Sequence, residues 1–563
     1  MSEAFQTVNV LDDRLNCKST AKFAVEKGGS SVTVSENMAN SASPSSQIFN
    51  IIVPSEQVLV DRRLEWSSII KFRLQFSNLP AGTYDLCNYG HDSALVAYPL
   101  HSLVTTMTGT INNNTVSVNM DDVLPLLSRM LDREHTAKYT NTTPTCLDNY
   151  LNFADGVDAV NNPLGSYSNT EKSNDYHSRG AFPLLNISTT GYGGANNTVV
   201  TSLANGTATL YVTVKVTEPF MLSPFIFAHD KVNSQAVYGI QNLNIRMNLN
   251  PNAIIWNQSQ GLTNGATPTP ALVPVPSVQV DSFEDAKMTL VYLSAHPENA
   301  MPTRNVVSFM NISRYISKSQ QINVGQSLTL NSNQIQLNTI PDKLGFALKR
   351  KVRTCADSVA FIPIEKVSIN WNNHSGILSS CNQEKLWLMG VEAGCNSSWL
   401  QYSGGARVYK SAVDAGTPVS PYPAIVTPLC GSPLVLDFAK HIEIVESYFA
   451  PGSLGQFALQ VQITAKNNTD AVITADDYDL IIYTIESGIW VTQSGVCQQF
   501  LGILTKADVL QASGQPTYYR SDVDRVVGAG LMDGLKSTVG SAMGQGASGG
   551  GASGGGESGG RRH

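Results

Sequence analysis

Residues 66–76, WSSIIKFRLQF, are the stretch that decides the fold class. Apolar side chains at Ile70, Phe72, Leu74 and Phe76 alternate with polar side chains at the positions between them. Successive side chains of a β-strand point to opposite faces of the sheet. The stretch therefore predicts a strand with one face buried and the other facing solvent, which is typical of antiparallel sheets.

The same pattern recurs along most of the chain. Further strands are expected at residues 48–53, 208–217, 240–249, 286–294, 333–340, 457–465 and 480–491. Turns rich in Gly, Pro, Asn and Ser separate these runs, and no alternation of strands with helices accompanies them. The pattern predicts an all-β chain of sandwiches rather than a parallel α/β sheet. Only residues 120–135 and 521–540 are expected to be helical.

The 563 residues are too many for one ordinary domain, and a Pro-rich run at 263–278 lies near the middle of the strand-bearing region. We expect each half to close on a long strand pair, 208–217 with 240–249 and 457–465 with 480–491. Two polar segments, 131–205 and 390–433, are expected to be long loops. The predicted division is an N-terminal arm (1–45), a first jelly roll (46–278), a second jelly roll (279–510), and a C-terminal arm with a Gly/Ser-rich tail (511–563).

Composition narrows the class of protein. Charged residues make up 14% of the chain and the formal net charge is −7, whereas an average soluble domain is about 25% charged. A chain of this charge offers no basic field for the phosphates of a nucleic acid, so direct nucleic acid binding is not expected. No apolar run approaches the ~20 residues that a membrane-spanning helix needs.

The eight cysteines show no CxxC motif and no regular spacing, and no signal peptide is recognisable ahead of them. Free, reduced thiols are therefore expected, in a chain made in the cytoplasm or nucleus.

Motifs that carry chemistry are weak. Residues 544–549 fit GxGxxG and residues 546–550 fit GxSxG, but both lie in the Gly/Ser tail, where no strand leads in and no helix follows. The nine histidines include neither HxH nor HExxH. We expect no catalytic, cofactor-binding or metal-binding residues, and a protein that is not an enzyme.

Two charged motifs have a structural and a functional interpretation. The basic run Lys349–Arg353 is interpreted as the solvated continuation of a strand at 345–348; the alternative is a nuclear localisation signal or a contact for an acidic partner. The acidic pairs Asp121-Asp122 and Asp476-Asp477 are interpreted as structural residues that cap or solvate the ends of helices or strands; the alternative is a pair of cation sites. The tryptophans are expected to anchor the core or an interface.

Several short stretches resemble the major capsid proteins of Polinton-like viruses and virophages, which belong to the double jelly-roll lineage together with adenovirus hexon. The stretches are YPLHSL (98–103), INNNTV (111–116), DVLP (122–125), Thr143-Pro144 with Asp148, LNTIPDKL (337–344), IEKVSINWNN (364–373) and SGIL (375–378). They are scattered over residues 50–510. Each stretch alone is a weak indication of the family, whereas the set taken together is moderately specific for it.

The resemblance implies a structural protein with two upright jelly rolls. Three chains would form a pseudo-hexagonal trimer, and many trimers would tile the icosahedral shell of a double-stranded DNA virus. The partners implied are the chain itself, penton and minor or cement capsid proteins, and an internal membrane reached by the C-terminal tail. The implied location is the virion.

A second class of function remains open on the sequence, namely a lectin-like or adhesin-like binding protein built from the same sandwiches. Such a protein would be expected to carry a secretion signal, disulfides or a fibrous repeat, none of which is recognisable in the sequence.

Overall fold

The structure is a computed structural model, and it describes residues 32–505 and 509 with several gaps. The gaps are 91–92, 132, 149–178, 205, 226–235, 259–273, 295–302, 324, 405, 411–423, 439, 445–448, 468–475, 494 and 503. The helix expected at 521–540 and the two glycine motifs of the tail lie outside the described residues.

Two sheets face each other in the first half of the chain. One sheet has the strand order β1-β15-β5-β12-β10 with β4 beside β15, and the other has the order β2-β3-β13-β8-β9. The strands are β1 (Val32–Met38), β2 (Ser41–Ser43), β3 (Ser46–Ile52), β4 (Val58–Val60), β5 (Glu65–Leu79), β8 (Val104–Ile111), β9 (Asn114–Val118), β10 (Asn186–Ser188), β12 (Gly206–Pro219), β13 (Asn242–Leu249) and β15 (Ser277–Ser294).

A second pair of sheets forms in the other half. One sheet has the order β16-β26-β19-β24 with β27 beside β26, and the other has the order β17-β25-β20-β21 with β18 beside β25. The strands are β16 (Arg304–Ile322), β17 (Ser327–Asn331), β18 (Ile335–Thr339), β19 (Lys343–Arg350), β20 (Ile364–Trp371), β21 (His374–Ile377), β24 (Leu434–Asp437), β25 (Leu454–Lys466), β26 (Asp476–Gln493) and β27 (Val496–Leu501).

Short elements decorate the two sandwiches. Three small two-stranded sheets pair β6 (Gly82–Asp85) with β11 (Val199–Leu203), β7 (Ser93–Leu95) with β14 (Trp256–Gln258), and β22 (Ala406–Lys410) with β23 (Ala424–Pro428). The helices are α1 (Pro99–Leu103), α2 (Met120–Met130), α3 (Arg133–Tyr139), the 3-10 turn η3 (Arg179–Ala181), α4 (Gln383–Glu392) and α5 (Trp399–Tyr402). The predicted all-β class with two tandem jelly-roll sandwiches and few short helices is confirmed.

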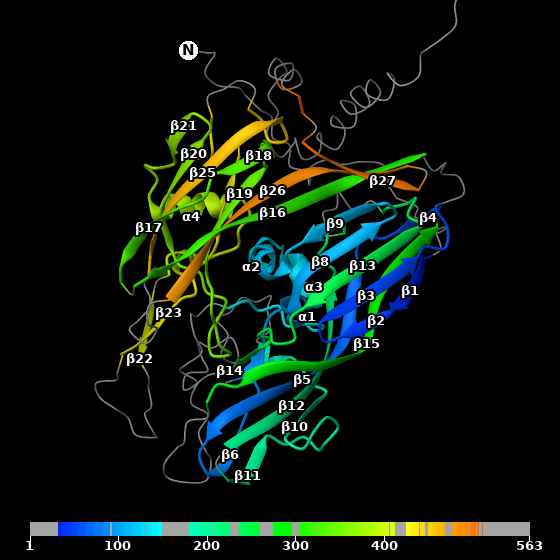
Figure 1. The fold of residues 1–563 in the computed structure, drawn as a ribbon, viewed down its shortest axis with the longest axis vertical. Helices are drawn as coiled ribbons and strands as arrows, with labels where there is room; N and C mark the ends of the chain where they lie inside the picture. Colours follow the sequence, from blue (N-terminus) through cyan, green and yellow to red (C-terminus); the bar gives the residue numbers. More distant parts are fainter. Residues whose placement is uncertain are drawn as a thin grey trace, which may run out of the picture.

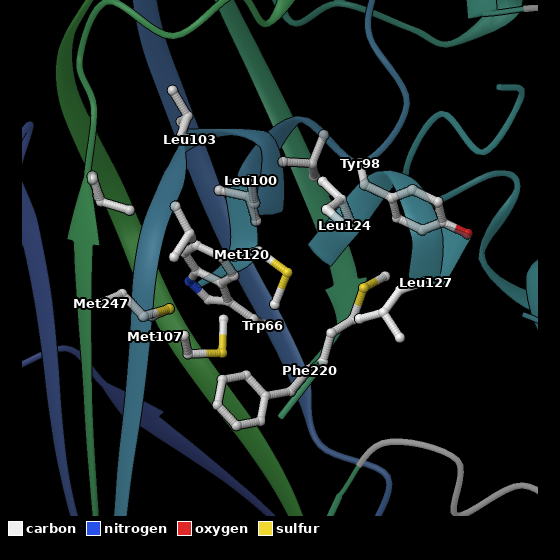
Figure 2. Packing of buried hydrophobic residues seen from close by; sticks show 14 of the residues in the cluster. Trp66, Tyr98, Leu100, Leu103, Met107, Met120, Leu124, Leu127, Phe220 and Met247 are labelled. Carbon is white, nitrogen blue, oxygen red and sulfur yellow. The ribbon is translucent and has the colours of Figure 1, made fainter. Parts of the chain in front are cut away.

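The alternating pattern correctly identified the buried faces. On β5, Ile70, Phe72, Leu74 and Phe76 are completely buried, and their partners on β12 lie directly opposite them in the antiparallel ladder. Figure 2 shows how Trp66 of β5 packs among Met107, Met120 and Met247, which come from β8, α2 and β13. The core of the first sandwich is therefore filled from both of its sheets and from α2.

Two expectations about strand neighbours were wrong. Residues 208–217 and 240–249 do not pair with each other, because β12 pairs with β5 and β10, whereas β13 pairs with β3 and β8 in the other sheet. The expected pair 457–465 with 480–491 is likewise divided between the two sheets of the second sandwich. Alternation indicates which face of a strand is buried, but it carries no information about which strand lies beside it.

The expected boundary between residues 278 and 279 falls inside a strand. β15 begins at Ser277 and runs to Ser294, and it pairs with β1, β4 and β5 of the first sandwich. Likewise β1 lies within the expected N-terminal arm, although it is a strand of the same sheet. The Pro-rich run therefore precedes the last strand of the first sandwich.

The helix expected at 120–135 is present as α2 followed by α3, whereas α4 and α5 were not expected. Both unexpected helices begin at a capped residue, since Asn382 accepts a hydrogen bond from the Lys385 N–H at 2.9 Å and Ser398 accepts one from the Gln401 N–H at 3.2 Å. α5 and the sheet β22–β23 lie within the segment expected to be a loop at 390–433.

The two sandwiches pack closely against each other. Figure 1 shows the first sandwich at the lower right and the second at the upper left, with α2 between them and the long strands β16 and β26 passing over β8 and β9. One continuous apolar cluster includes Trp66 and Leu126 of the first sandwich together with Tyr483 and Trp490 of β26. The distal part of the second sandwich has a separate core around Trp371.

Candidate functional site

Within the part of the chain that the structure describes, no three His, Cys, Asp or Glu residues lie close enough together to hold a metal ion. No described helix is long and apolar enough to cross a membrane. The seven described cysteines are free, and five of them are buried. The features that stand out are instead two surfaces: the seam between the sandwiches, and an apolar face on the outside of the first one.

A proline in α2 helps to build the seam. Pro125 has no N–H group, so the carbonyl of Asp121, four residues earlier, lacks its partner within the helix. The Nζ of Lys349, at the end of β19 in the second sandwich, donates a hydrogen bond to this carbonyl at 2.9 Å. A lysine of one sandwich thus satisfies a backbone group that the other sandwich leaves open.

The carboxylate of Asp122 is the centre of an ion-pair cluster at the same place. Its Oδ2 lies 2.9 Å from Nε of Arg314 and its Oδ1 lies 3.3 Å from Nζ of Lys349. The Tyr483 hydroxyl donates to the Asp122 carbonyl at 2.8 Å, and burial raises the pKa of this hydroxyl. Both acidic residues lie in the first turn of α2, at the helix end where they were expected. Asp121 is exposed, whereas Asp122 is mostly buried and paired across the seam.

The basic run 349–353 continues the strand as expected, since β19 ends at Arg350, but only Lys351 and Val352 are exposed. Besides the contacts of Lys349, Nη1 of Arg350 lies 3.0 Å from Oδ1 of Asp357, and Nη2 of Arg353 donates to the Ile254 carbonyl at 3.3 Å. Burial lowers the pKa of Arg353. The run joins the two sandwiches of one chain, since Lys349 meets Asp122 of the first half, whereas Arg350 pairs with Asp357 of the second half.

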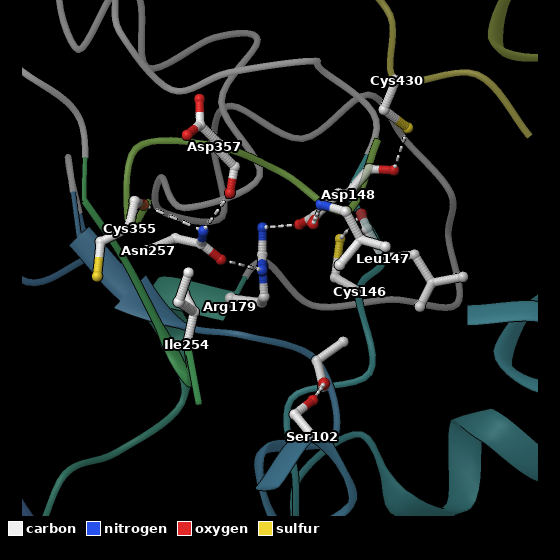
Figure 3. A network of polar contacts seen from close by, with 12 residues as sticks. Ser102, Cys146, Leu147, Asp148, Arg179, Ile254, Asn257, Cys355, Asp357 and Cys430 are labelled. Carbon is white, nitrogen blue, oxygen red and sulfur yellow. Dashed lines mark hydrogen bonds and ion pairs between the residues drawn. The ribbon is translucent and has the colours of Figure 1, made fainter. Parts of the chain in front are cut away.

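A second polar cluster crosses the seam nearby (Figure 3). The Arg179 side chain is completely buried, and its Nη2 lies 2.7 Å from Oδ1 of Asp148 while its Nη1 donates to Oδ1 of Asn257 at 3.1 Å. Asn257 Nδ2 in turn donates to the carbonyls of Cys355 and Asp357 in the second half, at 3.2 and 3.1 Å. The backbone N–H of Val359 donates to the Asp148 carboxylate at 2.8 Å. These contacts fix the loop 351–359 on the first sandwich.

The YPLHSL stretch forms α1, and its position is set by a buried carboxylate. Glu218, at the end of β12, accepts hydrogen bonds from the backbone N–H groups of Leu100 at 2.8 Å and His101 at 3.0 Å. Its Oε2 also lies 2.5 Å from Nδ1 of His101, and Thr143 donates to its Oε1 at 3.2 Å. The carboxylate therefore takes the place of the missing side-chain cap of this short helix.

The outer face of β1 has the reverse of the usual polarity. Val32, Val34 and Met38 are 61, 62 and 57% exposed, whereas Ser35 and Asn37 point toward the sandwich. A strand on the edge of a sandwich ordinarily turns its apolar side chains inward. In β1 the apolar side chains instead face outward, away from the core of the sandwich.

Neighbouring strands extend this apolar face. In the antiparallel register Val32 lies opposite Leu293, Leu293 opposite Leu59, and Val34 opposite Val291. Directly opposed residues share one face of a sheet. We call the set Val32, Val34, Met38, Leu59, Val291 and Leu293 the outer apolar face.

A charge-balanced ion pair lies within the outer apolar face, between Val34 and Met38. Nζ of Lys287 lies 2.9 Å from Oε2 of Glu36 and 3.8 Å from Oδ2 of Asp285. β1 is also the terminal strand of its sheet among the described residues, and it contains neither Pro nor Lys, which commonly block exposed edges. Figure 1 places it on the flank of the first sandwich that faces away from β17, β20 and β21.

Sequence reasoning named no residue of these two surfaces as a functional site. The alternation in VTVSENM (32–38) was a usable signal for β1, but no sequence pattern indicates that its apolar side faces outward. The residues that meet at the seam, such as Asp122 and Arg314, are far apart in the chain, so their contact could not be read from spacing.

Comparison with known proteins places the chain among viral capsid proteins. The family described as "Sputnik virophage major capsid protein 1st domain" matches residues 3–291, and the family described as "Major capsid protein V20 C-terminal domain" matches residues 312–488. The putative capsid protein V20 of Sputnik virophage is 27% identical over 554 residues, which cover 95% of this chain and 86% of the relative.

Solved structures are similar over nearly the whole chain. The Sputnik virophage structure determined by cryo-electron microscopy matches with a TM-score of 0.77 and 24% identity, over 93% of this chain and 100% of that chain. The mavirus major capsid protein matches with a TM-score of 0.71 and 15% identity, over 92% of this chain and 99% of that chain. At these identities the likeness establishes a common double jelly-roll fold.

Proposed function

The chain belongs to the family of virophage major capsid proteins, a structural component of the virion, and from this premise we propose that its copies assemble as trimers into an icosahedral shell. A capsid protein acts through contacts with copies of itself rather than through a reaction, so we propose a structural and not a catalytic role. The penton, minor capsid proteins and an internal membrane stay predicted partners, and the C-terminal tail stays the predicted link to them.

The observation that carries this proposal is the outer apolar face in a protein whose relatives are capsid proteins. Closed rings of identical subunits use heterologous contacts, in which one patch meets a different patch of the next copy. Apolar residues together with paired charges are usual in such a contact. The outer apolar face combines exposed apolar side chains with the Lys287–Glu36 pair, and it lies on the flank away from β17, β20 and β21 of its own chain.

We therefore propose that the outer apolar face packs against the second sandwich of a neighbouring copy within the trimer. Burying the remaining exposed surface of Val32, Val34 and Met38 would contribute roughly 1 kcal/mol each. That contribution is repeated at every contact of a closed ring, so even a modest face stabilises the assembly.

The division of the chain follows from the sheets. We propose that the first jelly roll runs from β1 to the end of β15 at Ser294 and that the second begins with β16 at Arg304. The family matches, which end at 291 and resume at 312, support a division in this interval.

The test replaces Val32 and Val34 together by glutamate in the full chain. Carboxylates on this face would have to be desolvated in the contact, so we expect native mass spectrometry to find the variant as a folded monomer and the unmodified chain as a trimer. In negative-stain electron microscopy the unmodified chain is expected to show pseudo-hexagonal particles that the variant lacks.

The matched control is Ile52→Glu on β3, since Ile52 is 80% exposed but lies on the other sheet of the first sandwich, outside both the outer apolar face and the second sandwich. It is expected to remain trimeric. A double variant that still forms trimers would rule out this face as the contact. An unmodified chain that stays monomeric and captures a glycan would instead favour the lectin-like alternative.

A further inference from the structure

A small cavity lies on the seam between the two sandwiches. Its volume is about 50 Å³, and its lining includes Ser102, Ser128 and Arg129 from the first sandwich and Arg353 and Val359 from the second. A cavity needs roughly 10–15 Å³ of space of this kind to hold one water molecule. The cavity therefore has room for a few water molecules or for a monatomic ion.

Arg129 lines this cavity and is only 3% exposed. Among the described residues no carboxylate lies within ion-pair distance of it. Its Nη1 is 3.4 Å from the Pro125 carbonyl, its Nη2 is 3.6 Å from Sγ of Cys430, and its guanidinium lies 5.2 Å from the centre of the Phe361 ring. Its Nε has no hydrogen-bond partner. A guanidinium stays charged in proteins, so this is a buried positive charge held by weak neutral contacts.

Arg353 lines the same cavity from the opposite sandwich. Its Nη2 donates to the Ile254 carbonyl at 3.3 Å, whereas its Nη1 has no partner in the described part of the structure. Burial lowers the pKa of Arg353, although nearby negative groups, Asp148 foremost, act in the opposite direction. Two cations from two different sandwiches thus meet at one cavity.

The remaining polar groups of the cavity do not supply the missing charge. Asp148 lines it, but its carboxylate is engaged by Nη2 of Arg179 at 2.7 Å and by the Val359 N–H at 2.8 Å (Figure 3). The hydroxyls of Ser102 and Ser128 donate to the carbonyls of Ala97 and Pro125, each at 3.2 Å. The cavity therefore offers guanidinium N–H donors and a net positive charge.

We propose that this cavity is a binding site for one small monovalent anion, of the size and charge of chloride, held between the guanidiniums of Arg129 and Arg353. The single negative charge of the anion offsets part of the positive charge of the two guanidiniums, and the anion accepts hydrogen bonds from their N–H groups. Because the two arginines belong to different sandwiches, the site exists only when the sandwiches are docked. Anion binding therefore stabilises the docked chain, whether or not the chain goes on to form a shell.

The test measures thermal unfolding of the full chain at constant ionic strength, with chloride replaced stepwise by the bulky anion gluconate. We expect the Tm to rise by about 2 °C or more in chloride and to saturate, as for a ligand that binds only the folded chain. Arg353→Met is expected to abolish this chloride-dependent rise. The control Lys71→Met removes a cation that pairs with Glu284 on the surface of the first sandwich, and it should keep the rise.

A direct measurement keeps the proposal testable if Arg353→Met folds poorly. The ³⁵Cl resonance of a chloride solution should broaden in the presence of the unmodified chain and sharpen again when bromide is added in excess. Equal Tm values in chloride and gluconate, or an unbroadened resonance, would mean that the cavity holds only water and would overturn the proposal. A chloride-dependent rise that survives in Arg353→Met would also overturn it.

Discussion

Asp122 joins the two sandwiches, whereas its neighbour Asp121 lies mostly in solvent. The carboxylate of Asp122 contacts both Arg314 and Lys349 across the seam, and its side chain is 13% exposed. The carboxylate of Asp121 is 3.6 Å from Lys349, but its side chain is 70% exposed. Two identical residues in sequence thus have different roles, because the helix turns them to different surroundings.

We expect Asp122→Asn to lower the free energy of unfolding by about 2 kcal/mol, because the change leaves two partly buried cations without their counter-charge. Urea unfolding followed by fluorescence measures this. Asp121→Asn is the matched control, and it should change stability by less than about 0.5 kcal/mol, since an exposed ion pair contributes little. Equal losses in the two variants would contradict the role given to Asp122.

At the scale of the element, α2 illustrates how a local defect becomes a tertiary contact. Pro125 leaves the Asp121 carbonyl without a partner in the helix, and Nζ of Lys349 in β19 donates a hydrogen bond to this carbonyl at 2.9 Å. The helix and the strand are thereby tied together at a position where an ordinary helix would have no free acceptor.

A double-mutant cycle tests the hydrogen bond between Lys349 and the Asp121 carbonyl. In Pro125→Ala the new N–H can bond to the Asp121 carbonyl, so Lys349→Met should cost about 1 kcal/mol less in that background than in the unmodified chain. Arg314→Met is the control pair, because Arg314 contacts the Asp122 carboxylate and not this carbonyl. Its cost should be the same in both backgrounds. If Lys349→Met lowers the free energy of unfolding equally in both backgrounds, the carbonyl does not depend on the lysine.

At the scale of the whole molecule, the seam makes the two sandwiches one mechanical unit. The apolar cluster of the first sandwich continues into β16, β19 and β26 of the second. These are the strands that also line the distal core around Trp371. Unfolding of one sandwich would therefore expose apolar surface on the other.

We expect the chain to unfold cooperatively, with both sandwiches losing protection at the same urea concentration. Hydrogen exchange read by mass spectrometry distinguishes them, since β12 reports on the first sandwich and β25 on the second. Asp122→Asn should move both transitions together to lower urea. Loss of protection in β25 well before β12 would show that the sandwiches are independent domains.

Much of the fold could be predicted because it rests on local patterning. The alternation in β5 and β12 identified both strands and their buried faces, and the family-like stretches indicated the double jelly roll. α4 was not expected, since its mixed apolar and polar residues lack a clear helical period, although Asn382 offered a capping signal.

The sequence by itself determined the strands with clear alternation such as β5 and β12, that the chain is all-β with few charged residues, and that no catalytic or metal-binding motif stands out. Only the tertiary structure decided which strands are neighbours, that β15 closes the first sandwich, and that Asp122, Arg314 and Lys349 meet. The physical reason is that side-chain alternation is a property of single strands, whereas pairing and interface contacts join residues up to hundreds of positions apart. That the apolar side of β1 faces outward can likewise be recognised only once the inside of the sandwich is known.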